Sequence, residues 1–358
     1  MFSSSSKKNL LNILNHKIGP LTVAKSGWGS IVEISEHSRV VPLLFDKIKD
    51  KAQELGVPDD IYDMLKSRYK LNLIRNNLLL EELGALRIAL AREAVSCILL
   101  KGVFLTNTIF RDNIGARVMA DVDILVKEKD IEKTDIVLRG LGYSLPPADI
   151  GYIGRLAGSR KAAMYFKYYD NRHALAPVHL HWHIVNISKP FFDSHWFGID
   201  MDAVWKGAER LEADDDTFFV MNPAHAVLAL TVHGFGHSFS RLDIIYDIHS
   251  YIMLYGERID WEETVRLAGR WGVTMPLRMG LFLAVRMFCT SIPQAVIDIM
   301  NSGKPSMIEN LFESYVYSSS KASENMNAIL YYAHSKGFRG KINFLKTALN
   351  FKLAKKAN

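Results

Sequence analysis

The segment from Ala116 to Val126, ARVMADVDILV, constrains the fold more than any other stretch of the chain. It is an apolar, strand-like run that carries two carboxylates, Asp121 and Asp123, separated by one residue. Alternate residues of a strand project from the same face, so these side chains are expected to lie side by side. Like charges held that close repel, and each resists ionising beside the other. A positive group should therefore lie between them, and a divalent metal ion is the obvious candidate.

Composition indicates a soluble protein of two or three domains. The chain has 358 residues, of which 49% are hydrophobic and 23% charged, as in ordinary globular proteins. Its two cysteines, Cys97 and Cys289, lie in apolar surroundings, which argues against a disulfide framework and fits a reducing cytoplasm. The longest apolar stretch is interrupted by Arg278 and Arg286 and is too short to span a bilayer. We therefore expect a cytoplasmic location.

The positive charge is concentrated at the C-terminal end. The chain has a net charge of +6, while residues 334–358 contain seven lysines and arginines and no acid, so the rest is close to neutral. A near-neutral body argues against long nucleic acid as a partner. The tail also has apolar residues at helical spacing, and a basic amphipathic helix of this kind can bind a membrane surface or an acidic partner. The alternative, which we favour, is a terminal helix that packs its apolar side on its own domain.

The remaining pattern predicts an α+β fold, in which helical regions flank a small mixed β-sheet. Four regions are expected: a helical N-terminal region (1–75), an α/β core (76–190), a helical C-terminal domain (191–333) and the basic tail (334–358). In the core, SCILL, VDILV, AAMYFKYYD and APVHLHWHIV read as strands, and DIEKTDIVLRGLGY as a helix. After Pro190 the pattern is helical for most of the remaining chain, and Pro223 begins one such helix.

A second motif, Lys101-Gly102, follows the SCILL strand and opens a helix. Such a turn points backbone N–H groups at whatever lies above it, and the lysine adds a full positive charge, so a phosphate group suits it. Alone this is a weak signal, because strand–glycine–helix turns are common in α/β proteins.

Together with the Asp-x-Asp strand, the motif becomes specific. The run LLKG…FRDNIGARVMADVDILVKEKDIEKTDIVLRGLGY closely resembles the "uncharacterised nucleotidyltransferase" family of the DNA polymerase β-type superfamily. That family shows a Lys-Gly turn, an arginine shortly before Asp-x-Asp-hydrophobic-Leu-Val, and a helix that ends in Leu-Gly-Tyr. The resemblance continues through VHLHWHI and PAHAVLALTVHGFGHSFSRLDIIYDIHSYI and covers roughly residues 71–293.

The resemblance implies a nucleotidyltransferase core in which Asp121 and Asp123 hold Mg²⁺ or Mn²⁺ against the triphosphate of a nucleoside triphosphate (NTP). It also implies that Lys101 and Gly102 hold phosphate, and that Arg117 orders the loop or touches the triphosphate. The chemistry is reasonable, because a metal neutralises charge on the attacking and leaving oxygens, and oxygen ligands suit Mg²⁺. The expected activity is transfer of a nucleotidyl group to a small-molecule, sugar or peptide acceptor.

One position departs from the family. Enzymes of this superfamily usually need a third carboxylate from a neighbouring strand, and His179 stands where that acid is often found. His179, His181 and His183 share one face of their strand. Imidazole can bind a metal, but it adds no negative charge and favours softer ions than Mg²⁺. Either His179 is an altered ligand or base, or the centre is weakened. The alternative to a metal role is that the three histidines are hydrogen-bonded groups that face a polar cleft.

A further group of residues is expected near the nucleotide. His233 and His237 lie at i, i+4 on a helix whose glycines, Gly234 and Gly236, suggest a bend. By resemblance the helical domain closes over the nucleotide or acceptor, which adds to the candidate nucleotide-binding residues. These are His181, His237 and Arg241, with Asp247 further along the same segment.

Two alternatives to the enzyme remain open. The first is a nucleotide-binding or partner-binding protein that kept the fold and lost the third acid. The second is a metalloprotein built on the histidines 179, 181, 183, 233 and 237. Metal binding separates them, because Mg²⁺ or Mn²⁺ bound with nucleotide favours the transferase, whereas tight zinc favours the histidine site.

Overall fold

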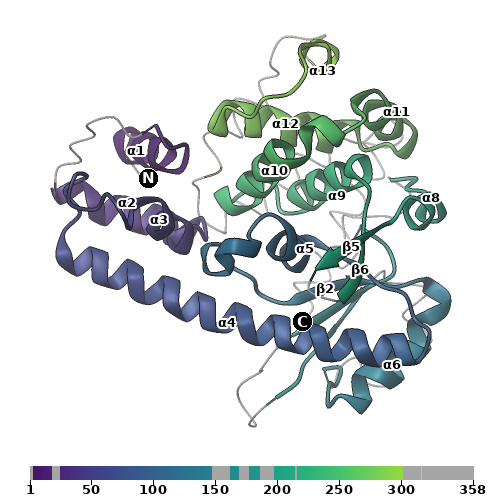
Figure 1. Cartoon of the computed structure of the whole chain (residues 1–358). Coiled ribbons are helices and arrows are strands. Elements are labelled where there is room, and N and C mark those ends of the chain that lie inside the picture. The colour runs from purple at the N-terminus through teal and green to yellow at the C-terminus, as the bar shows by residue number, and fades with distance from the viewer. Residues whose placement is uncertain are drawn as a thin grey trace, which may run out of the picture.

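The computed structural model describes residues 3–17, 25–146, 162–168, 177–185, 197–213, 216–300 and 316. Within them the protein is a mixed α+β fold, in which one six-stranded sheet is enclosed by helices (Figure 1). This agrees with the α+β class expected from the sequence. The basic tail, residues 334–358, lies outside the described residues, so its proposed membrane or partner contact stays a prediction.

The sheet is mixed, with the strand order β3-β4-β2-β1-β6-β5. β2 runs parallel to β4, and β1 runs parallel to β6, whereas the β1–β2, β3–β4 and β5–β6 pairs are antiparallel. The strands are β1 (Ile98–Leu99), β2 (Val122–Leu125), β3 (Ala162–Tyr165), β4 (Val178–His181), β5 (Glu209–Ala213) and β6 (Asp216–Val220). All four residues of β2 are buried, as expected for a central strand covered on both faces.

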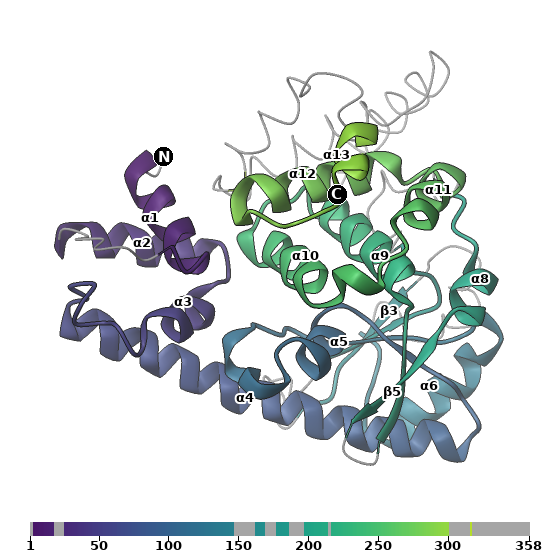
Figure 2. The same cartoon turned by 45° about the horizontal axis from the view of Figure 1, so that its top comes forward.

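The first three helices pack on one another, and the third of them packs on one long helix, α4 (Asp59–Arg92), which begins after Pro58 with two acids in its first turn. The preceding helices are α1 (Ser4–Leu14), α2 (Lys25–His37) and α3 (Val41–Ile48). They lie along the N-terminal half of α4 (Figure 2), and α4 continues past the boundary expected at residue 75 to reach the sheet region. The core helices that follow are α5 (Lys101–Thr108) and α6 (Ile131–Gly140), with a short 3-10 segment, η1 (Arg111–Ala116).

The later helices form a compact bundle above the sheet. They are α8 (Met201–Lys206), α9 (Pro223–Gly236), α10 (Leu242–Tyr255), α11 (Trp261–Trp271), α12 (Thr274–Phe288) and α13 (Gln294–Met300). Pro223 occupies the first turn of α9, and the side chain of Asn222 caps the helix by accepting from the backbone N–H of His225 at 2.9 Å. No helix in the described part of the chain has the length and apolar character needed to cross a membrane.

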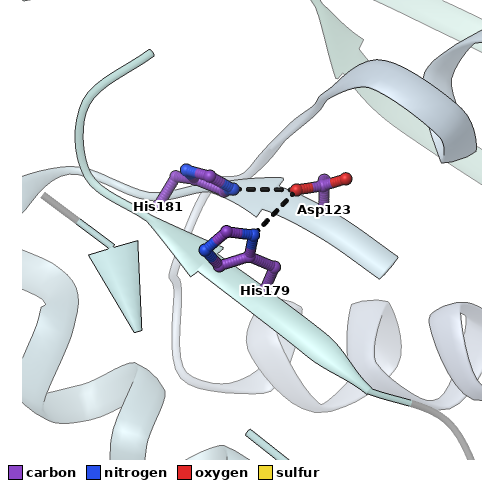
Figure 3. Close-up of side chains that lie close together, drawn as sticks. All are labelled: Asp123, His179 and His181. Carbon is purple, nitrogen blue, oxygen red and sulfur yellow. Dashed lines mark hydrogen bonds and ion pairs between the residues drawn. The ribbon is translucent and has the colours of Figure 1, made fainter. Parts of the chain in front are cut away.

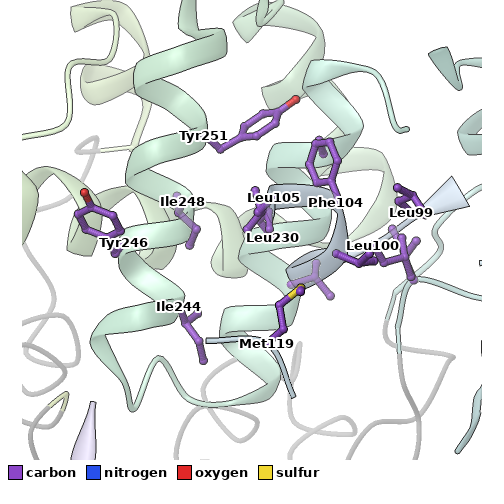
Figure 4. Packing of buried hydrophobic residues seen from close by; sticks show 14 of the residues in the cluster. Leu99, Leu100, Phe104, Leu105, Met119, Leu230, Ile244, Tyr246, Ile248 and Tyr251 are labelled. Atoms are coloured by element: carbon purple, nitrogen blue, oxygen red, sulfur yellow. The ribbon is translucent and has the colours of Figure 1, made fainter. Parts of the chain in front are cut away.

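One continuous core joins the sheet to the bundle. α5 lies between them, with Phe104 and Leu105 buried against residues of α9 and α10 (Figure 4). The ring of Phe104 lies 5.7 Å from that of Tyr251 on α10, centroid to centroid. Because α5 begins at Lys101, this packing fixes the strand-to-helix turn relative to the bundle.

Two strands lie where the sequence pattern predicts mainly helix. β5 and β6 fall after Pro190, in the region expected to be a helical domain, and β6 pairs with β1 near the centre of the sheet. The sheet therefore extends beyond residues 76–190. Its formation depends on pairing between Ile98 and Phe219, which are distant in sequence, so local periodicity carries little information about it.

Candidate functional site

The two aspartates of the Asp-x-Asp segment lie at the beginning of β2. Asp123 is the second residue of the strand and is 3% exposed, while Asp121 directly precedes the strand and is partly exposed. In the parallel pairing of β2 with β4, Asp123 lies opposite His179. The sheet register therefore brings an imidazole of β4 to the two carboxylates.

One oxygen of Asp123 contacts three donor groups. Its Oδ1 lies 2.5 Å from the Nζ of Lys101 and 2.8 Å from the Nε2 of His181. The Nδ1 of His179 is 3.3 Å from the same oxygen (Figure 3). Burial, and then the charge of Lys101, lower the pKa of His181 well below its usual range. A neutral His181 leaves Lys101 as the full cation beside Asp123.

The pKa values of the two aspartates are shifted in opposite directions. Burial, and then the charge of Asp123, raise the pKa of Asp121 to about 6. Burial alone would also raise the pKa of Asp123, but Lys101 and the hydrogen bonds from His179 and His181 hold it well below its usual range. The pair thus behaves as two close carboxylates do when a single cation compensates one of them. Lys101 and His179 lower the pKa of Asp121 by less than burial and Asp123 raise it, so Asp121 is the less compensated carboxylate.

A cavity of about 290 Å³ opens between the helical bundle and the part of the sheet where β2 and β4 begin. Its charged and imidazole side chains come from four parts of the chain: the N-terminal helices, the start of α5, the start of β2 and β4, and the segment from α9 to α10. These residues are Arg39, Lys101, Arg117, Asp121, Asp123, His179, His233, His237, Arg241 and Asp243. Cations face the two carboxylates across the cavity, an arrangement that suits a polyanion bound with a metal ion.

The Lys101-Gly102 turn is held in an unusual backbone conformation. Lys101 has φ of 46°, in the left-handed region that residues with a Cβ rarely adopt. Such strain persists where the surrounding structure over-determines it, often at functional sites. At Gly102, an added Cβ would lie 2.8 Å from the Nη1 of Arg117, so the glycine allows the guanidinium to pass close to the helix start.

Arg117 is committed to a partner on the bundle. Its Nε and Nη2 donate to the two carboxylate oxygens of Asp247 on α10, at 2.8 and 2.7 Å. Both side chains are nearly buried, with 12% and 8% exposed. Arg117 therefore ties the loop before β2 to the bundle, which fits the loop-ordering role that the resemblance implied for it. Asp247 does not line the cavity among the described residues.

The histidines of α9 reach the cavity from the bundle side. His233 lies in the last turn of α9, and His237 is the residue that follows the helix, with their ring centroids 4.6 Å apart. A bend was expected at Gly234 and Gly236, and α9 ends there. A Cβ on Gly234 would lie 2.4 Å from the ring of Phe239, so the close return of the chain requires glycine.

His183 lies apart from the other two histidines of its segment. β4 ends at His181, and the His183 Nδ1 accepts a hydrogen bond from the backbone N–H of Val185 at 3.0 Å. His183 lines a different cavity, beside Trp182 and Trp205. The histidine-only metal site is therefore not assembled as the sequence alternative requires, although His179 and His181 remain 4.0 Å apart, ring to ring.

The residues present suit a divalent cation. Asp123, His179 and His181 each offer a ligand atom, and these atoms all lie within 4.8 Å of one another. Asp121 adds a carboxylate oxygen 3.9 Å from the Nδ1 of His179. The carboxylates are the oxygen ligands that Mg²⁺ and Mn²⁺ prefer, and the imidazoles broaden the range of metals. Since Lys101 occupies Oδ1 of Asp123, a cation at that oxygen requires the ammonium group to move.

Two asparagines of α4 support the site and were missed at the level of sequence. Asn72 and Asn76 both donate from Nδ2 to the carbonyl oxygen of Arg117, at 2.9 and 2.7 Å. A signal was available, because they interrupt an apolar stripe at spacings of three and four residues. The apolar members of this stripe are Leu65, Leu79, Leu83, Leu86 and Leu90.

Arg39 and Asp243 were also missed. Asp243 lies at the start of α10 and contacts both Arg241, at 3.0 Å, and Arg39, at 3.7 Å. The backbone N–H of Asp243 donates to the carbonyl of Ser38, which brings the two segments together. This contact joins residues more than 200 positions apart, so no local sequence pattern predicts it.

Comparison with known families agrees with this geometry. The chain matches the family model described as "Uncharacterised nucleotidyltransferase" over residues 24–289, about three quarters of its length. No curated protein matches it. The matched region includes the Lys-Gly turn, the Asp-x-Asp strand and the histidines of β4 and α9. The chain therefore belongs to the uncharacterised nucleotidyltransferase family, whose description indicates nucleotidyl transfer and whose motifs line the cavity between sheet and bundle.

Proposed function

We propose that the protein is a metal-dependent nucleotidyltransferase that moves a nucleotidyl group from an NTP to a small-molecule, sugar or peptide acceptor. The observation that carries this proposal is the pair Asp121 and Asp123, of which Asp121 is incompletely compensated at the floor of a cavity with cationic walls. A site that needs one more cation, and can then hold several phosphate oxygens, suits an NTP with its metal ion. We place this activity in the cytoplasm, as the cysteine usage suggests.

Asp121 and Asp123 would hold Mg²⁺ or Mn²⁺, with His179 beside them. When bound, such an ion supplies neutralisation of charge on the triphosphate and on the attacking oxygen. The protein's own cationic side chains would bind the phosphate oxygens that the metal ion does not bind. Lys101 lies at the carboxylates and would exchange part of its contact with Asp123 for a phosphate oxygen, and Gly102 leaves room for close approach to the backbone.

The bundle side of the cavity would hold the rest of the nucleotide. Arg241 and His237 line the wall that faces the carboxylates. Arg241 shares its charge with Asp243, which orients the guanidinium toward the junction of the bundle with the N-terminal helices. His181 is buried behind Asp123 and acts on the nucleotide through that carboxylate, so we assign it a positioning role.

We assign proton transfer to His179. The acceptor hydroxyl gives its proton to a ring nitrogen of His179 as its oxygen forms a bond to the α-phosphorus. The bond from the α-phosphorus to the bridging oxygen breaks, and pyrophosphate leaves. The imidazolium that results lies 3.3 Å from Asp123 and 3.9 Å from Asp121, so both carboxylates stabilise it.

The test uses the full chain with each NTP labelled at the α-phosphate and a mixture of hydroxyl-bearing acceptors. We expect label transfer with Mg²⁺ or Mn²⁺, and its loss in Asp121→Asn with Asp123→Asn. Asp112→Asn, an exposed acid of the preceding segment, is the matched control and should keep full transfer. Equal activity of the double variant and the control would remove the carboxylates from the reaction.

A second candidate is a protein that binds nucleotide without turnover. Two observations favour it: Lys101 already occupies Asp123, and His179 stands where a third acid is expected. The substitution His179→Asp separates the two. If the natural protein is a weakened three-acid centre, an added carboxylate tightens binding of a hard cation and raises transfer. If His179 is the working base, the same change abolishes transfer. Nucleotide binding with no transfer by either form supports the second candidate.

A further inference from the structure

A second cavity of about 370 Å³ adjoins the site on the side of the N-terminal helices. It lies between the junction of α2 with α3 and the middle of α4. Arg39 and Val118 line both this cavity and the one above the carboxylates, so the two cavities are neighbours. We call the second cavity the arginine groove, because Arg39, Arg68 and Arg75 line it.

Arg75 connects the groove directly to the catalytic strand. It projects from α4, and its Nη2 donates to the carbonyl oxygen of Ala120 at 3.0 Å. Ala120 immediately precedes Asp121 and itself lines the first cavity. A group bound beside Arg75 would therefore be next to the segment that carries the carboxylates.

The charge in the groove is incompletely compensated. Among its described lining residues there are three arginines and one acid, Glu36. Glu36 pairs with Arg68 at 3.6 Å, but both side chains are about half exposed, so this surface pair is weak. Arg75 is exposed, and the group that its Nη2 contacts is a neutral carbonyl. Arg39 contacts Asp243 at 3.7 Å, yet burial lowers its pKa, with Arg241 and Arg117 adding to the effect.

The junction that carries Arg39 is also built in a strained conformation. Arg39 has φ of 58°, in the left-handed region, between α2 and α3. Holding a β-carbon-bearing residue there costs free energy, so the surrounding contacts must favour the position of this side chain. Those contacts include the hydrogen bond from Asp243 to Ser38, which fixes the junction against the bundle.

We propose that the arginine groove binds a phosphate group of the acceptor, so that the substrate receiving the nucleotidyl group is a small hydroxyl-bearing phosphomonoester. The proposal rests on the transferase function proposed above. A guanidinium group binds two oxygens of one anion, and a phosphate monoester offers three oxygens and up to two negative charges, so a groove lined by three arginines favours phosphate over a single carboxylate. The near-neutral charge of the chain outside its tail argues for a small molecule over a long nucleic acid.

The experiment measures binding of inorganic phosphate by equilibrium dialysis, with the first cavity filled by a non-hydrolysable NTP and Mg²⁺. The variant is Arg68→Gln with Arg75→Gln, two exposed positions where the fold tolerates the change. The matched control is Arg92→Gln, an exposed arginine at the end of the same helix. We expect the variant to bind phosphate about tenfold more weakly or worse, and the control to match the natural protein.

Three results would overturn the proposal. One is equal phosphate affinity in the variant and the control. Another is a variant whose affinity for the NTP itself falls tenfold, because the groove would then hold the nucleotide's own phosphates. The third is a short RNA that displaces phosphate at a far lower concentration, which would make a polymer the occupant. If no nucleotide binds at all, the transferase proposal fails. Phosphate binding to the nucleotide-free proteins then still tests the groove. If the groove binds phosphate, the variant has one phosphate site fewer than the control.

Discussion

Two charged pairs beside the cavity differ in what they require. Asp121 and Asp123 are like charges at alternate positions at the start of one strand, and the pKa of Asp121 is raised to about 6. Arg117 and Asp247 are opposite charges joined by two hydrogen bonds across the sheet–bundle boundary. The negative charge of the first pair is only partly compensated, by Lys101 at Asp123, whereas the charges of the second pair compensate each other. Ligand binding is therefore expected at the first pair, and the second holds the walls of the cavity in place.

The largest expected effect comes from breaking the ion pair between Arg117 and Asp247. Asp247→Ala leaves the guanidinium of Arg117 nearly buried without its carboxylate, and we expect a loss of about 3–5 kcal/mol in the free energy of unfolding. Urea denaturation measures this loss. Glu257→Ala, at an exposed acid in the short 3-10 segment that follows α10, should stay within about 0.5 kcal/mol of the natural protein.

A double substitution sharpens the interpretation of that loss. Arg117→Met with Asp247→Leu removes both charges and keeps apolar volume, so most of the lost stability should return. If the double variant is as unstable as Asp247→Ala, shape and packing at the boundary decide its stability, and the buried charge does not.

The unsatisfied pair predicts opposite signs at neighbouring positions. In metal-free protein at pH 7, Asp121→Asn removes an incompletely compensated charge and should raise the free energy of unfolding by about 1–2 kcal/mol. Asp123→Asn removes the negative charge that pairs with Lys101 and strengthens the hydrogen bond with His181, and should lower it by at least about 1 kcal/mol. Urea denaturation in the presence of EDTA compares them, and a decrease in both variants would mean that Asp121 is structural.

The two pairs also differ in whether the sequence alone predicts them. The juxtaposition of Asp121 and Asp123 follows from strand alternation, which is local, and the Lys-Gly turn follows from a strand next to a helix. The pairing of Arg117 with Asp247 spans 130 positions, and only the packed fold chooses it. Arg39 depends on a backbone contact with α10 that has no sequence signature.

Missed strands have a similar cause. The segment that forms β5 and β6 reads ERLEADDDTFFV, in which acids dilute the apolar alternation. Its strand identity comes from antiparallel pairing within the segment and from one parallel pairing with β1. Such pairing stabilises a strand through neighbours on the sheet more than through intrinsic preference, so the local pattern was a poor guide.

Titration of Asp121 gives a third, smaller effect with a defined direction. Its folded pKa of about 6 exceeds the value of 3.8 for an unperturbed carboxyl, so the folded state binds the proton more tightly. Its contribution to stability is present below 3.8 and is lost as the pH rises through 6. Relative to Asp121→Asn, the metal-free natural protein should therefore lose stability from pH 5 to pH 6.5 and show a constant difference above about pH 7.

The difference between the two proteins is the measurement, because other groups titrate in both. His249, for example, has its pKa lowered to about 4 by burial, so its contribution is lost as the pH falls. Bound Mg²⁺ with nucleotide should reverse the trend, since it binds the ionised carboxylate. A pH-independent difference between natural protein and variant would show that Asp121 is ionised throughout and already compensated.

The smallest expected effect concerns the strained Lys101-Gly102 turn between β1 and α5. Lys101→Gly and Lys101→Ala both remove the ammonium group and should both weaken triphosphate binding to the same extent. They differ at the backbone, where φ of 46° favours glycine by about 1–2 kcal/mol over a residue with a Cβ. The greater flexibility of glycine in the unfolded chain offsets about 0.5–1 kcal/mol of this gain. We therefore expect Lys101→Gly to be more stable than Lys101→Ala by up to about 1 kcal/mol in urea denaturation. A more stable alanine variant would mean that the left-handed turn exists because the lysine is drawn toward Asp123, and that it relaxes once this contact is gone.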